Sequence, residues 1–156
     1  MSGLNKLACL LLLASPAAVA SEVYLLATMQ FGGSNLAQSI FLHEPSISRL
    51  ADCQEAVRLG QRDRDWAHYR HFLNHQRFQG FTAELNYQCV LSDQHFSAWN
   101  DRARYNQAYL IRVDEQSRLS LKSVASQAQC VAQLAALSPE QAQQTRCALG
   151  NQTVVP

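Results

Sequence analysis

Alternating hydrophobic and polar positions predict a hairpin near the start of the chain. In residues 21–31, every second position from Val23 to Phe31 is apolar, which is the period of a strand with one buried face. Residues 32–35, GGSN, are typical of a turn because glycine adopts positive φ without steric cost. Residues 36–43 then return as a second strand.

A helical period follows the hairpin. Four inward positions have helical spacing: Ile47, Leu50, Cys53 and Val57. They predict a helix over residues 47–59, which ends at Gly60 because glycine commonly follows the last helical residue. A second helix is expected over residues 62–77, and strict alternation predicts a strand over residues 81–91.

The second half of the chain has a similar order of elements. Its expected elements are a strand (106–113), a turn (114–117), a strand (118–122), a helix (124–137), a short helix from 138 and a strand (145–149). Ser138 and Pro139 are typical of a helix cap and first turn. Between the halves, residues 92–105 are polar except for two large apolar rings, Phe96 and Trp99, so we expect an ordered connection rather than a flexible linker.

This order predicts one α+β domain with an antiparallel sheet built from two hairpin–helix–strand units and helices on one face. The units cover residues 22–91 and 105–150. Their similarity in element order fits a true duplication, but it also fits two unrelated units side by side.

The first twenty residues resemble a secretory signal peptide. Lys6 precedes a short apolar run and an Ala-Val-Ala ending, so we expect cleavage after Ala20 and a mature domain over residues 21–156. The run is broken at Ser15 and Pro16, whereas a transmembrane span needs about 20 apolar residues. The expected location is therefore periplasmic or extracellular, without a transmembrane anchor.

Charge and cysteine content narrow the partner and the compartment. The full chain has 13 basic and 12 acidic residues, so removal of Lys6 with the signal peptide leaves 12 of each. This balance argues against nucleic acid or an anionic membrane as the main partner. Beyond Cys9, the chain has four cysteines: Cys53, Cys89, Cys130 and Cys147. An even number in an exported protein predicts two disulfides. Joining each helix to the strand that follows it predicts the pairs Cys53–Cys89 and Cys130–Cys147.

Three histidines, His68, His71 and His75, lie close together in the second expected helix. At about 100° per residue they fall within about 60° of one another, and roughly 120° from the apolar stripe of the helix. They are therefore expected on an exposed flank. Neighbouring arginines oppose a cation there, so we expect no metal, although the spacing also fits a metal site or a pH-sensitive surface.

No catalytic signature stands out. The sequence has no G-x-S-x-G, H-E-x-x-H or glycine-rich phosphate loop. The leading hypothesis is an exported, non-enzymatic binding or accessory module that acts on a protein or envelope partner and needs no cofactor. One alternative is a metal-binding protein that uses the three histidines. Another is a small hydrolase with an unidentified site, centred on a histidine that the sequence does not single out. His43 and Glu44 could form a base and its orienter, but an isolated pair of this kind more often arises by chance at the edge of a sheet.

Overall fold

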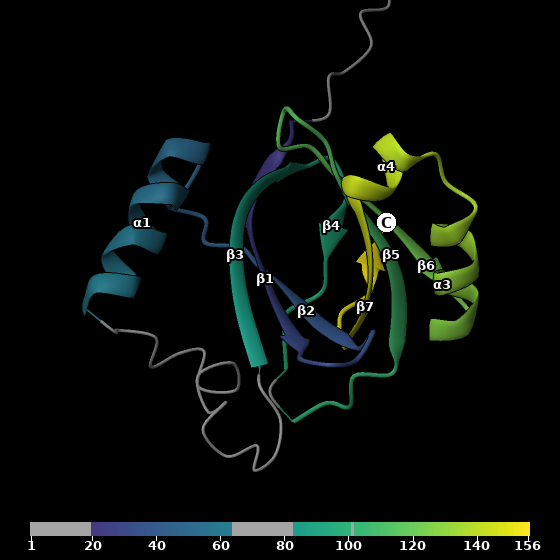
Figure 1. Ribbon diagram of the computed structural model, residues 1–156. Coiled ribbons are helices and arrows are strands. Elements are labelled where there is room, and N and C mark those ends of the chain that lie inside the picture. The colour runs from purple at the N-terminus through teal and green to yellow at the C-terminus, as the bar shows by residue number, and fades with distance from the viewer. Residues whose placement is uncertain (1–19, 64–82, 101) are drawn as a thin grey trace, which may run out of the picture.

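The computed structural model describes residues 20–63, 83–100 and 102–156 (Figure 1). In chain order its elements are β1 (Glu22–Phe31), β2 (Ala37–Leu42), α1 (Leu50–Asp63), β3 (Ala83–Ser92), β4 (His95–Phe96), β5 (Gln107–Val113), β6 (Leu119–Val124), α3 (Gln127–Ala135), α4 (Pro139–Gln143), β7 (Thr145–Gly150) and β8 (Val154–Val155). No helix in these ranges is long and apolar enough to cross a membrane.

Six strands form one mixed, curled sheet in the order β3-β1-β2-β7-β5-β6 (Figure 1). Neighbouring strands are antiparallel except β2 and β7, which run parallel and share one register pair, Gln38 with Leu149. The curl brings the two edges together at one end, where the Leu91 amide donates to the Ser117 carbonyl at 2.8 Å. A separate two-stranded sheet is formed by β4 and β8, which run antiparallel.

The predicted architecture is therefore wrong. The sheet is mixed and curled rather than an antiparallel sheet assembled from two hairpin–helix–strand units. Both helices lie against the outer face of the sheet, but the curl places α1 and α3 on opposite sides of the molecule, so they do not form one layer (Figure 1). Alternation indicates which side chains of a strand share a face, but it does not say which strands become neighbours or how strongly a sheet curls.

The inner face of the curl carries the main apolar core. This core includes Tyr24, Leu26, Phe41, Val90, Tyr109, Ile111, Leu121 and Ala148. Phe96 of β4 fills the centre, stacked on Phe41 with a ring separation of 4.4 Å and edge-on to Tyr24 at 4.9 Å. Such aromatic pairs contribute about 1 kcal/mol each beyond the area they bury. The core therefore closes the end of the inner face where β1 begins.

Gln152 ties the C-terminal segment to this closed end. Its side chain is almost fully buried, accepts a hydrogen bond from the Phe41 amide and donates to the Phe41 and Ser97 carbonyls. Its own carbonyl accepts a hydrogen bond from the Tyr109 hydroxyl. Buried polar groups are retained where they are hydrogen-bonded, so one glutamine holds three segments together.

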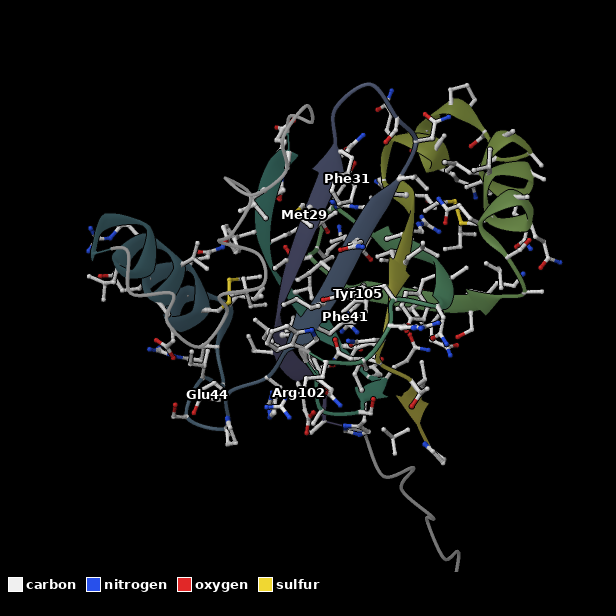
Figure 2. All side chains as sticks on the ribbon, turned by 90° about the horizontal axis from the view of Figure 1, so that it is seen from below. Met29, Phe31, Phe41, Glu44, Arg102 and Tyr105 are labelled. Atoms are coloured by element: carbon white, nitrogen blue, oxygen red, sulfur yellow. A yellow bond between two sulfur atoms is a disulfide. The ribbon has the colours of Figure 1, made fainter. Side chains whose placement is uncertain are left out.

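The outer face of the sheet has its own apolar clusters. Ala27, Met29 and Ile40 are buried there, and Trp99 and Tyr105 from the connection pack against them. Figure 2 labels Met29 on β1 and Tyr105 of the connection. Both apolar rings of the connection are packed, Phe96 on the inner core and Trp99 on this outer cluster. The Trp99 indole also donates to the Tyr105 hydroxyl at 3.0 Å.

Two disulfides fasten the helices to the outer face, in the expected pairs. The α1 disulfide, Cys53–Cys89, joins α1 to β3 across 36 residues of sequence, and the α3 disulfide, Cys130–Cys147, joins α3 to β7 across 17. Bonds of this kind persist in oxidising compartments. The expected cap of α4 is also present, since the Ser138 hydroxyl accepts from the Gln141 amide at 3.3 Å.

Candidate functional site

The inner face changes from apolar to polar along β1 and β3. Four register pairs show the change in order: Tyr24 opposite Val90, Leu26 opposite Gln88, Thr28 opposite Asn86, and Gln30 opposite Glu84. Because side chains of a strand alternate between faces, all eight belong to the inner face. The first pairs lie in the apolar core, and the last pairs line an opening at the other end of the curl.

This opening is a pocket of about 360 Å³ between the curled sheet and α3, hereafter the Arg146 pocket. It is lined by Thr28, Gln30, Asn35, Ala37, Glu84, Asn86, Val131, Leu134, Thr145, Arg146 and Cys147. One wall, from β1 and β3, is polar, and the other contains Val131 and Leu134 of α3. The volume lies in the range of about 300–1,000 Å³ typical of small-ligand sites.

Among the described lining residues, Arg146 is the one basic side chain. It is two residues from the fully buried Ala148, so β7 directs both side chains to the inner face. Its Nη2 donates to Gln88 Oε1 at 2.9 Å, across the curl from β7 to β3. Burial lowers the pKa of the Arg146 guanidinium, which nevertheless stays charged at neutral pH.

The charge of Arg146 is not neutralised by any residue that the structure describes. The guanidinium forms no ion pair with an acidic residue of the described ranges, and Gln88 is its one hydrogen-bond partner there. Glu84 lines the same pocket without pairing with it. A guanidinium has five N–H donors, so most of them remain available to a ligand.

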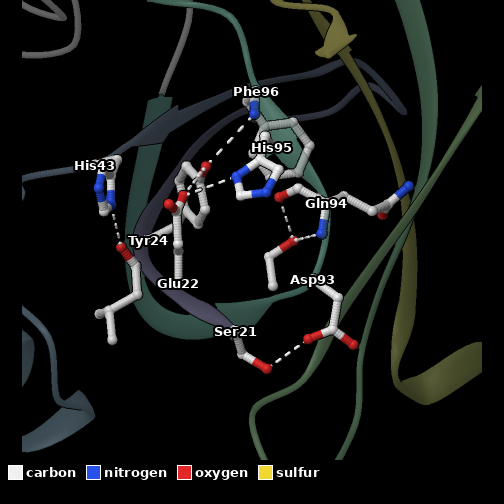
Figure 3. A network of polar contacts seen from close by, with 10 residues as sticks. Ser21, Glu22, Tyr24, His43, Asp93, Gln94, His95 and Phe96 are labelled. Carbon is white, nitrogen blue, oxygen red and sulfur yellow. Dashed lines mark hydrogen bonds and ion pairs between the residues drawn. The ribbon is translucent and has the colours of Figure 1, made fainter. Parts of the chain in front are cut away.

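A second polar cluster surrounds Glu22 at the closed end of the curl (Figure 3). The Glu22 carboxylate accepts from the Tyr24 hydroxyl at 2.9 Å and from His95 Nδ1 at 3.0 Å. Burial alone would raise the pKa of Glu22, but these two hydrogen bonds and the electrostatic interactions with His43 and His95 together outweigh it and lower that pKa. Burial, together with the bond to Glu22, raises the pKa of Tyr24 to about 12. The cluster therefore fastens β4 to the start of β1.

His43 lies beside this cluster and is held by the backbone. Its Nδ1 donates to the Val23 carbonyl at 2.9 Å, and its ring lies 5.2 Å from that of Tyr24 (Figure 3). This nitrogen has a backbone acceptor rather than Glu44 as its partner. Neither His43 nor His95 lines any of the described pockets.

The predicted histidine cluster, His68, His71 and His75, lies outside the described residues, so both its exposure and its metal binding stay predictions. In the described ranges, no group of three or more potential ligands is placed to hold a metal ion. The sequence reasoning did not identify Arg146. The sequence does carry one indication of it. Arg146 is a charged residue in an expected strand, at a position that alternates with the small residues Ala148 and Gly150 on the same face.

Residues 151–153, Asn-Gln-Thr, match the sequence pattern of an N-glycosylation site and connect β7 to β8. Asn151 Nδ2, the atom that a glycan would modify, donates to the carbonyls of Asn100 and Ala103. A glycan replaces one of the two Nδ2 hydrogens, so at most one of these contacts could remain.

Comparison with known proteins finds no family model that matches the chain, no matching curated protein and no matching solved structure.

Proposed function

We propose that this chain is an exported, non-enzymatic binding module that engages a protein or envelope partner through the Arg146 pocket. The observation that carries the proposal is a half-buried guanidinium that lines a pocket and has only an amide partner among the described residues. A desolvated charge without a counter-charge is unfavourable, and a bound anionic group relieves that cost. The two disulfides support the exported location.

The chemistry of the lining favours binding over catalysis. Among the described lining residues, Cys147 is in a disulfide, the Thr28 hydroxyl is bonded to the Ser39 hydroxyl at 2.8 Å, and the Thr145 hydroxyl donates to the Gln141 carbonyl at 2.7 Å. Nucleophilic catalysis requires a hydroxyl or thiol beside a base. The described histidines belong to the closed end of the curl, whereas the pocket lies at the open end.

Site-specific photo-crosslinking tests the proposal. A photoreactive amino acid at Val131, which is 39% exposed on the α3 wall, is compared with one at the adjacent exposed Ala132, which does not line the pocket. The purified protein is irradiated with the native exported fraction. We expect a discrete crosslinked partner from position 131, absent from position 132 and lost on Arg146→Gln. Equal crosslinking from both positions, or none from either, contradicts the proposal.

A further inference from the structure

The composition of the Arg146 pocket narrows the class of group that it can bind. Arginine presents a planar fork of donors that matches a carboxylate in a bidentate arrangement. Among the described lining residues, neutral amide groups come from Gln30 and Asn86 on the polar wall and from Asn35 in the turn between β1 and β2. These amides can donate to an oxygen or accept from an N–H group.

Glu84 and the α3 wall add two further restrictions. A second anionic charge would be repelled by the Glu84 carboxylate in the same pocket, which disfavours polyanions such as phosphate esters. Val131 and Leu134 form the apolar wall, so a ligand gains affinity when its carboxylate is attached to an apolar group. An ammonium or amide N–H of the ligand would be complementary to Glu84.

We infer that the Arg146 pocket binds a single carboxylate attached to a small apolar group, with the guanidinium on the carboxylate and the apolar group against Val131 and Leu134. This inference rests on the proposed function and specifies its ligand. Two sources carry this chemistry: a free apolar amino acid, and the C-terminal residue of a polypeptide. Both present one carboxylate, one apolar side chain and a nitrogen two bonds from the carboxyl carbon.

The test is titration of the ¹⁵N-labelled full-length protein, followed by NMR. The probes are N-acetyl-L-leucine, its neutral amide, free L-leucine, and a pentapeptide ending in leucine with either a free or an amidated C-terminus. We expect free carboxylates to shift the amide signals of Ala37, Val131 and Thr145, with affinity at least about tenfold higher than that of the matched amides. Tighter binding of L-leucine identifies a free amino acid as the source, and tighter binding of the peptide identifies a chain terminus.

Variants separate a specific contact from general charge. Arg146→Gln should abolish the preference for acid over amide, and Arg146→Lys should reduce it by about tenfold because lysine lacks the planar fork. Arg112→Gln is the matched control, since Arg112 is exposed and bonds only to Gln144 among the described residues. It should leave binding unchanged.

The acid-against-amide comparison uses the wild-type protein, so it does not depend on whether the variants fold. Equal binding of acid and amide, or no binding of either at millimolar concentration, overturns the inference. If the acid shows no preference over the amide but Val131 still crosslinks to a partner, the proposed binding function stands and only the carboxylate inference fails.

Discussion

Gly150 occupies a position where even one added methyl group should destabilise the protein. A Cβ atom there would lie 2.4 Å from Tyr109 Cε2 and 3.1 Å from the Ser39 carbonyl oxygen. Carbon atoms normally approach to about 3.5–4.0 Å, so the ring must move by more than about 1 Å. Tyr109 is 1% exposed, and its hydroxyl is bonded to the Gln152 carbonyl.

The magnitude follows from these contacts. Overpacking a close-packed core costs about 1–3 kcal/mol, and loss of the Tyr109 hydrogen bond adds about 1 kcal/mol. Alanine restricts the unfolded chain more than glycine and returns about 0.4–1 kcal/mol. We therefore expect Gly150→Ala to lower the free energy of unfolding by about 2–3 kcal/mol, measured by urea denaturation with circular dichroism.

A double-mutant cycle tests the stated cause. Tyr109→Leu removes the ring edge that the new methyl group would meet, so Gly150→Ala should cost less than about 1 kcal/mol in that background. Gly33→Ala is the control, because Gly33 has φ +75° and open space around its Cβ position. Its cost of about 1–2 kcal/mol comes from backbone strain and should be the same with and without Tyr109. Full additivity of Gly150→Ala with Tyr109→Leu, or wild-type stability of Gly150→Ala alone, would refute the reasoning.

Three further results are expected. Replacing both cysteines of the α1 disulfide with alanine should lower the free energy of unfolding by about 3.8 kcal/mol, and the same change in the α3 disulfide should lower it by about 3.1 kcal/mol. The α1 disulfide has the larger effect because it closes the longer loop of chain, and chemical denaturation of each variant should give that order. Because folding lowers the pKa of Glu22, this carboxylate stabilises the folded protein above its unfolded pKa of about 4.3, and that stabilisation is lost as pH falls through the folded pKa. Glu22→Gln should therefore flatten the curve of unfolding free energy against pH below about pH 5, and an unchanged slope would contradict this. Tyr24 and Tyr109 should ionise near pH 12 in an ultraviolet absorbance titration of the folded protein. Because the same tyrosines ionise near pH 10 in the unfolded chain, the free energy of unfolding should fall as pH rises from about 10 to 12. Ionisation of all five tyrosines near pH 10 in the folded protein would contradict both expectations.

Local features of the fold could be predicted from the sequence because they depend on neighbouring residues. Alternation from Val23 to Phe31 marks β1, and the serine–proline pair at 138–139 marks the start of α4. Joining each helix cysteine to the next strand also predicts the disulfide pairs that the structure contains.

The curl and the parallel contact could not be predicted, because both depend on residues far apart in sequence. β2 and β7 meet through Gln38 and Leu149, which are separated by most of the chain. β4 and β8 have two residues each, too few to show a period. The sheet prediction failed for these reasons, although most strands lie near their expected ranges.

The candidate site was missed for a related reason. Arg146 becomes distinctive only when the curl brings β7 opposite Gln88 of β3 and leaves the guanidinium without a described acidic partner. In the sequence it is one arginine among several. The histidine cluster is more conspicuous in the sequence, but its residues lie outside the described ranges.

One measurement tests most directly whether a partner binds in the Arg146 pocket through a carboxylate. The crosslink from Val131 to its partner is recorded with increasing N-acetyl-L-leucine, and in parallel with the neutral amide of that compound. The acid should suppress the crosslink in a saturable way, and the amide should leave it unchanged at the same concentration. A crosslink that persists at saturating acid, or that both compounds suppress equally, would contradict a carboxylate-mediated interaction at Arg146.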